Sequence, residues 1–209
     1  MDQGEIIEFD ENYKFVRAIG DPNCIGLTVA YKPKRIAVDS VGRMYVLVNN
    51  CYEGFAELDP EGNFNRYVGA TPVTVSLIDR FWRSIQTAAQ QARSSLWLPT
   101  TYSDLAIDAE GFLYASIADS TSKDPIRKLN ASGDDVMPES EFTERPMGDF
   151  DESGKSLSNL TNIAVADDGR FAVLDSVYSR IFVYSNDGNL MYEFGGSGNA
   201  EGRLNSPVG

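Results

Sequence analysis

Three segments of this chain repeat one pattern. IAVDSVGRMYV, LAIDAEGFLYA and IAVADDGRFAV begin at residues 36, 105 and 163, and they align without a gap. Each contains an alternating apolar run, a polar turn with a glycine, and a second apolar run, which is typical of two paired antiparallel strands. Because so small a sheet cannot bury both of its faces, copies of it must stack on one another. The repeat predicts an all-β fold built from similar small sheets.

The second half of the unit is repeated as well. ELDPEGNFNRYVG ends on Gly69 as VYSNDGNLMYEFG ends on Gly195, and EFDENYKFVRAIG, ending on Gly20, is the same half-unit. Four strands per unit at this period predict the blades of a β-propeller. The chain resembles the NHL-repeat family, whose unit runs apolar-Ala-Val-Asp-x-x-Gly, then Asp…Arg-Ile-x-Val-Phe, and closes on Phe-Gly. This resemblance implies a propeller fold and is nearly silent on activity.

We expect a single propeller domain over residues 1–209, with about four four-stranded blades of a six-bladed ring. A six-bladed ring needs roughly 250 to 300 residues at about forty to fifty per blade. The sequence is therefore expected to be part of a longer protein that stops before the ring closes. The open ends, Glu5–Ile19 and Asn205–Gly209, would expose apolar blade faces, so self-association through these ends is expected.

Residues 70–99 form the first of two insertions into the repeat. Apolar residues recur there at three- and four-residue intervals, which predicts an amphipathic helix from Val75 to Ser94. One interpretation is that the helix packs its apolar side on the propeller. In the other, it docks on a partner or a membrane face, with Phe81, Trp82 and Arg83 as the contact residues.

Residues 135–158 form the second insertion, which is predicted to be a long acidic loop. Its seven acidic side chains are Asp135, Glu139, Glu141, Glu144, Asp149, Asp151 and Glu152. Three apolar side chains could hold this loop to the protein surface, namely Phe142, Met147 and Phe150.

Charge and composition exclude several functions. The formal net charge is -13, and histidine is absent from the sequence. An acidic surface repels phosphate backbones, so the nucleic-acid binding of some NHL propellers is disfavoured. Lyases that resemble this chain depend on histidine, and without it neither zinc hydrolysis nor Ser-His-Asp catalysis is expected. No apolar run is long enough to span a membrane, and an extracytoplasmic or membrane-attached location through a missing segment is favoured.

The candidate ligand-binding residues come from the loops of one face. Blade-to-blade connections and the loops between second and third strands share a face in a propeller, and this face carries both insertions. Binding residues are commonly found on loops that rigid strands hold in place. We therefore expect a ligand site on this insertion-bearing face, near the propeller axis. The candidates are Asn49, Asn50, Asp119, Asp175 and Tyr178.

These loop residues also have structural interpretations. Asp175 and Arg180 match the Asp…Arg positions of the NHL unit, where such a pair is structural. Asp39 and Asp108 precede turns, where aspartate accepts backbone hydrogen bonds. The asparagine and aspartate oxygens among the candidates are of the type that binds calcium, although no loop has the spacing of a known calcium motif.

Two functions remain open. The first is a non-catalytic binding module or scaffold that recognises a protein, a peptide or a glycan through the insertion-bearing face. The second is a calcium-dependent, lactonase-like hydrolase with oxygen ligands at the propeller axis. Asn49, Asp119 and Asp175 supply part of such a ligand set, but no glutamate partner is evident. We favour binding without a cofactor.

The two cysteines are expected to lie close together. Cys24 lies in the connection into the second blade, and Cys51 lies in a loop of that blade on the same face. Both a disulfide, which would stabilise the fold by closing a loop, and two separate thiols remain open.

Overall fold

The structure is a computed structural model that describes residues 4–27, 29–70, 101–119, 122, 124–137, 147–151 and 157–207. Its described part is all-β and contains no helix, and so no helix that could cross a membrane. The predicted helix at 75–94, with Phe81, Trp82 and Arg83, lies outside the described residues, as does much of the acidic loop.

Thirteen strands in the described ranges form four antiparallel sheets. The first sheet pairs β1 (Ile6–Phe9) with β2 (Phe15–Ile19). The second comprises β3 (Pro33–Val38), β4 (Met44–Val48), β5 (Phe55–Leu58) and β6 (Phe64–Val68). The third comprises β7 (Asp104–Ile107), β8 (Leu113–Ser116) and β9 (Ile126–Leu129). The fourth comprises β10 (Leu160–Val165), β11 (Phe171–Asp175), β12 (Arg180–Tyr184) and β13 (Leu190–Gly195).

Each sheet follows the chain order, as the repeat predicts for blades. The third sheet has only the start of a fourth strand, where Asp135 forms a bridge with Leu129 and the Val136 N–H donates to the Lys128 carbonyl at 2.7 Å. The three larger sheets match the three predicted full units, and the two-stranded first sheet matches the predicted N-terminal half-unit.

Aspartate side chains build the tight turns between strands. Asp39 Oδ1 accepts the backbone N–H groups of Val41 and Arg43 at 3.0 and 2.9 Å. Asp108 accepts those of Glu110 and Phe112 in the same way, at 3.0 and 2.9 Å. The predicted structural role of these two aspartates is confirmed, because each carboxylate accepts backbone N–H groups in a tight turn.

The hydrophobic cores lie between neighbouring sheets. In β4, Met44, Val46 and Val48 pack toward the first sheet, whereas Tyr45 and Leu47 pack toward the third. This alternation follows from the two-residue period of a strand, and it explains why all of β4 is buried. A third core lies between the third and fourth sheets. Each sheet therefore needs neighbours on both faces, as the blades of a propeller do.

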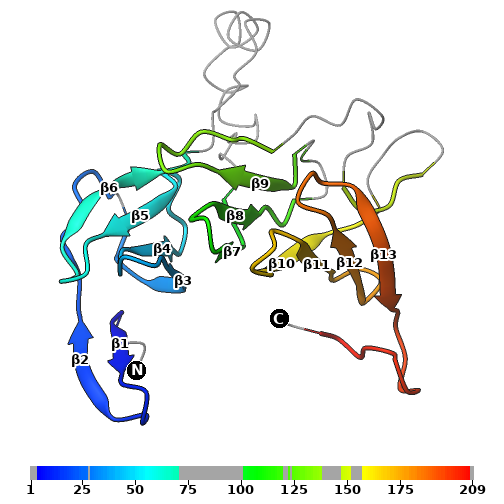
Figure 1. Ribbon diagram of the computed structural model, residues 1–209, viewed down its shortest axis with the longest axis horizontal. Helices are drawn as coiled ribbons and strands as arrows, with labels where there is room; N and C mark the ends of the chain where they lie inside the picture. Colours follow the sequence, from blue (N-terminus) through cyan, green and yellow to red (C-terminus); the bar gives the residue numbers. More distant parts are fainter. Residues whose placement is uncertain are drawn as a thin grey trace, which may run out of the picture.

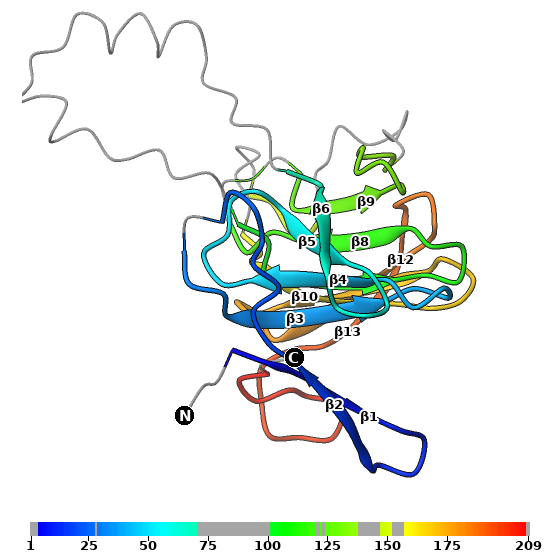
Figure 2. The same ribbon diagram turned by 90° about the vertical axis from the view of Figure 1, so that its left-hand side faces the viewer.

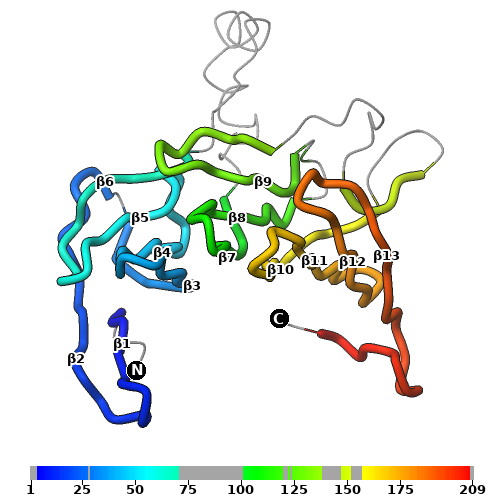
Figure 3. Tube along the Cα trace, viewed as in Figure 1, coloured from blue at the N-terminus to red at the C-terminus, as the bar shows by residue number. Residues whose placement is uncertain are grey.

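The four sheets follow one another around an open arc (Figure 1). Strands β3, β7 and β10 face the inside of the arc, and β6, β9 and β13 lie on its rim (Figure 3). The β1–β2 sheet pairs with no other strand among the described residues, and it projects away from the second sheet (Figure 2). Apolar side chains are exposed at both ends of the arc, namely Ile7, Phe9, Phe15 and Val16 on the first sheet and Leu190, Met191, Tyr192 and Phe194 on β13.

The described residues that flank both insertions lie at the strand ends that carry the second-to-third-strand loops, as the repeat predicts. Val68, the last residue of β6, pairs with Phe55, the first residue of β5, so residue 70 leaves the sheet beside a second-to-third-strand loop. The Tyr102 hydroxyl donates to the Gly69 carbonyl at 2.7 Å, so the two ends of the first insertion meet. Strand β10 likewise begins at Leu160, which pairs with Asp175 at the end of β11.

Both cysteines lie in the core between the first and second sheets, so the prediction that they are close is confirmed. Both are free thiols in this structure.

Candidate functional site

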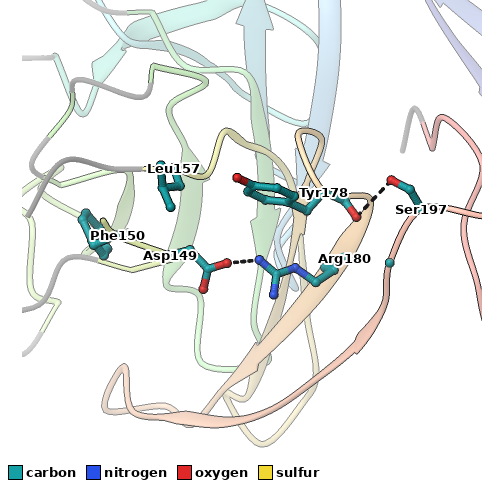
Figure 4. Close-up of a pocket in the computed structure, with 7 residues that line it drawn as sticks. Asp149, Phe150, Leu157, Tyr178, Arg180 and Ser197 are labelled. Carbon is teal, nitrogen blue, oxygen red and sulfur yellow. Dashed lines mark hydrogen bonds and ion pairs between the residues drawn. The ribbon is translucent and has the colours of Figure 1, made fainter. Parts of the chain in front are cut away.

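A pocket of about 470 Å³ opens at the insertion-bearing end of the fourth sheet. We call it the Arg180 pocket, and its lining residues are Asp149, Phe150, Leu157, Tyr178, Arg180, Gly196 and Ser197. They come from both described margins of the acidic insertion, from the loop between β11 and β12, and from the connection after β13. Figure 4 shows how these side chains lie around the pocket.

Antiparallel pairing brings these segments together. Arg180 begins β12 and pairs with Asp175 at the end of β11 and with Gly195 at the end of β13. Ser179 adopts a φ of 53°, which allows the loop to turn sharply, and its carbonyl accepts the Gly196 N–H at 2.7 Å. These contacts place the segment after β13 beside the β11–β12 loop.

A chain of hydrogen bonds holds Asp149 at the pocket. Asp175, whose side chain is fully buried, accepts the Ser158 hydroxyl at 3.1 Å through Oδ2. Ser158 Oγ in turn accepts the Asp149 N–H at 2.9 Å. The Tyr184 hydroxyl accepts the Gly148 N–H at 3.0 Å, and burial raises the pKa of Tyr184 to about 12, so the phenol stays neutral. Asp175 and Tyr184 therefore act as positioning residues beneath the pocket.

Arg180 lies between two carboxylates and two aromatic rings. Its Nη2 forms an ion pair with Asp149, and its Nη1 lies 3.3 Å from Glu193 Oε2. The guanidinium carbon lies 5.1 Å from the centre of the Tyr178 ring and 5.2 Å from that of Phe182, within the range of cation–π attraction. Its Nε is buried and has no hydrogen-bond partner among the residues that the structure describes. Asp175 and Arg180, which were predicted to form a structural pair, lie opposite one another in β11 and β12, and the ion pairs of Arg180 in the described part are with Asp149 and Glu193.

Tyr178 is the predicted ligand-binding residue that lines this pocket. Its side chain is 42% exposed, and its carbonyl accepts the Ser197 hydroxyl at 3.4 Å. The ring lies over the guanidinium of Arg180, with Phe150 and Leu157 across the pocket (Figure 4). The pocket therefore combines an exposed aromatic ring with adjacent hydrogen-bond donors and acceptors.

The other predicted residues do not gather at one place. Asn49 and Asn50 are exposed in the turn after β4, where Asn50 has a φ of 57° and the Asn49 N–H donates to the Lys32 carbonyl at 2.9 Å. Asp119 belongs to the loop after β8 in the third sheet. Within the part of the chain that the structure describes, no three acidic or cysteine side chains are grouped so that they could hold a metal ion.

The inside of the arc carries a polar network that sequence reasoning missed. Asp104, at the start of β7, accepts Arg35 Nε at 3.0 Å through Oδ1 and Asn162 Nδ2 at 3.2 Å through Oδ2. These residues lie on the first strands of three successive sheets. A guanidinium, rather than an open ligand site, therefore faces this carboxylate. The Arg180 pocket lies instead beside β12 and β13, the two outer strands of the fourth sheet.

Comparison with solved structures supports the fold described above. No family model and no curated protein sequence matches the chain. Among solved structures, a streptogramin B lyase has a TM-score of 0.53 at 15% identity, and virginiamycin B lyase from Staphylococcus aureus has 0.53 at 10%. A protein of unknown function from Bacteroides caccae has a TM-score of 0.50 at 14% identity.

These sheets resemble propeller blades. The matches cover 92 or 93% of this chain, and the chain spans 48 to 55% of the length of the matched proteins. At such low identity the likeness is one of fold alone. Membership of the NHL family, as distinct from the propeller fold, stays a prediction.

Proposed function

We propose that this chain is part of a non-catalytic, NHL-type propeller that binds a protein, peptide or glycan ligand through its insertion-bearing face. The observation that carries the proposal is the Arg180 pocket, which is built by the insertion, a second-to-third-strand loop and a blade connection. Loops held by rigid strands are the usual place for binding residues. The pocket also has the size and the mixture of apolar and polar groups that small-ligand sites have.

The chemistry of the pocket favours binding over turnover. The carboxylates of Asp149 and Glu193 are paired with Arg180 rather than directed at a base or a nucleophile. The sequence contains no histidine to act as a proton acceptor near neutral pH. Any reaction in this pocket would have to use groups that already hold the site together.

The alternative of a calcium-dependent, lactonase-like hydrolase fits the described residues less well. Asp175 would be one of its ligands, but both of its oxygens are used within the protein. Oδ1 accepts the N–H groups of Asn159 and Val177 at 3.1 and 3.0 Å, and Oδ2 accepts Ser158. Binding of calcium there would break these bonds.

Peptide and glycan arrays probed with the labelled protein test the proposed function. We expect ligands whose binding is lost in the variant Tyr178→Ala and kept in Tyr13→Ala, a control at a 90% exposed tyrosine in the β1–β2 turn. Binding unaffected by Tyr178→Ala would contradict the proposed site. Turnover of a simple lactone with calcium, together with calcium-dependent thermal stabilisation, would favour the hydrolase instead.

We also propose that the exposed end of the first sheet associates with a second copy of the chain. Phe9 on β1 pairs with Phe15 on β2, and these two side chains, together with Ile7 and Val16 of the same sheet, are about half exposed or more. An unpaired apolar sheet of this kind is rarely left in solvent. Sedimentation velocity should show association that increases with concentration and decreases in the double variant Phe9→Ser, Phe15→Ser. A monomer at all concentrations would contradict it.

A further inference from the structure

We propose that the Arg180 pocket binds an uncharged saccharide. This inference rests on the proposed binding function and names the chemical class of its ligand. Charge is the first reason, because the pocket already balances its own cation. Arg180 is already paired with Asp149 and Glu193, so an anionic ligand would meet the carboxylate of Asp149, which lines the pocket, and a guanidinium whose charge is already balanced. A cationic ligand would compete with Arg180 for both carboxylates. A neutral ligand leaves these pairs intact.

The exposed aromatic ring is the second reason. Tyr178 is 42% exposed, and the guanidinium of Arg180 supports the ring through a cation–π contact of 5.1 Å. Phe182, which lies on β12 with Arg180, also packs against the guanidinium, and this contact limits the movement of the Arg180 side chain. A supported ring is a flat apolar platform, and the C–H face of a pyranose is a flat apolar surface of similar size.

Adjacent donors and acceptors are the third reason. Asp149 presents carboxylate oxygens beside the N–H groups of Arg180, and Ser197 adds a hydroxyl on the other side of Tyr178 (Figure 4). Neighbouring sugar hydroxyls each donate and accept, so a pair of them can bond to the acidic and basic partners at once. Hydrogen bonds to charged groups of this kind are stronger than those between neutral groups.

The fixed position of Asp149 is the fourth reason. Its backbone is held by Ser158, which is held in turn by buried Asp175, and its carboxylate is paired with Arg180, so Asp149 is in place before a ligand arrives. Fixed polar groups lose little freedom on binding, which favours recognition by direction of hydrogen bonds. An open pocket of about 470 Å³ accommodates one or two sugar rings of a longer chain.

Saturation-transfer NMR with defined sugars tests the inference. The neutral probes are maltose, cellobiose and N,N′-diacetylchitobiose, and the charged controls are glucuronic acid and glucosamine. We expect at least one neutral disaccharide to bind, and Tyr178→Ala to weaken its binding about tenfold, as loss of one stacking contact would. Tyr178→Phe should retain most of the affinity, and Tyr13→Ala should retain all of it. Thermal unfolding checks that each variant is folded.

The outcomes separate the two proposals. If peptides bind in a manner that depends on Tyr178 while no neutral saccharide does, the saccharide inference is wrong and the proposed binding function stands. Stronger binding of glucuronic acid or glucosamine than of the neutral sugars would also overturn the inference. If neither peptides nor saccharides bind, both proposals fail.

Discussion

Arg35 donates its Nε hydrogen to Asp104 Oδ1 at 3.0 Å, and this bond joins the second sheet to the third. The other oxygen of Asp104 accepts Asn162 Nδ2 and the Ile163 N–H, both at 3.2 Å, from the fourth sheet. One largely buried carboxylate therefore connects three successive sheets on the inside of the arc. The arrangement adds a polar link to the hydrophobic cores that join sheets whose strands pair only within each sheet.

Replacing this carboxylate should destabilise the stack. Asp104→Ala leaves the Ile163 N–H buried without an acceptor, and we expect a loss of about 2 to 3 kcal/mol in the free energy of unfolding. Arg35→Ala should cost less, about 1 kcal/mol, because Arg35 is half exposed. Urea denaturation followed by circular dichroism of the β-sheets measures both values. Equal losses, or a larger loss for Arg35→Ala, would contradict the central role of Asp104.

Two glycines with positive φ offer a matched test of packing. Gly54 has a φ of 106°, and a Cβ there would lie 2.3 Å from the Val68 carbonyl oxygen. Gly111 has a φ of 88°, and apart from its chain neighbours no atom of the described residues lies within 4 Å of its Cβ position. Gly111→Ala should cost about 1 kcal/mol through backbone strain alone, and Gly54→Ala at least twice as much. Similar losses in thermal or urea unfolding would show that the strands near Gly54 move apart easily.

Stability should fall at alkaline pH because buried tyrosines must keep their protons. Burial raises the pKa values of Tyr102 and Tyr184 to about 12, from an ordinary value near 10. Below pH 10 these tyrosines are protonated in both the folded and the unfolded protein, so the full stability is present. Between pH 10 and 12 the unfolded chain loses these protons and the folded chain keeps them, so stability falls by about 1.4 kcal/mol per pH unit per tyrosine.

Unfolding measured from pH 8 to 12 checks this expectation. Tyr184→Phe should flatten the decline, whereas Tyr13→Phe, at an exposed ring, should leave it unchanged. A stability that stays constant to pH 12 would show that these phenols are not buried in the folded protein.

The strands and turns were predictable from the sequence because their causes are local. The two strands predicted for the repeat that begins at residue 163 form as β10 and β11, since their alternation and the glycine turn between them depend only on neighbouring residues. The role of Asp39 in its turn was predictable for the same reason, because it depends on nearby residues. Asp39 makes hydrogen bonds to residues only two and four positions away.

The site was harder to predict because its partners are distant in the sequence. Tyr178 was a candidate, but its pocket lies at outer strands rather than near the axis. Asp149, which pairs with Arg180 across 31 residues, was seen only as one charge among seven in an acidic insertion. The bond from Arg35 to Asp104 spans 69 residues. Such pairs depend on how the sheets stack. The repeat pattern predicts the sheets, but it does not show which side chains of two neighbouring sheets face one another.

The cysteines should be unreactive in the folded protein. Cys24 and Cys51 are both buried, and burial raises the pKa of each thiol, that of Cys51 to about 12. The Cys51 thiol also donates to Glu53 Oε2 at 3.2 Å. Since the thiolate is the reactive form, we expect little reaction with a disulfide reagent at pH 8 and two free thiols after unfolding. Fast reaction of the native protein, or no free thiol after unfolding, would contradict this.

The most direct test of the binding account is an amide chemical-shift map of the isotope-labelled protein during titration with each neutral disaccharide and with any peptide selected on the arrays. We predict that the largest shifts fall on the Arg180 pocket, at Asp149, Tyr178, Ser179, Gly196 and Ser197. Shifts confined to the Asn49–Asn50 turn or to Asp119, with the pocket unchanged, would contradict the account and return the ligand site to the loops nearer the axis.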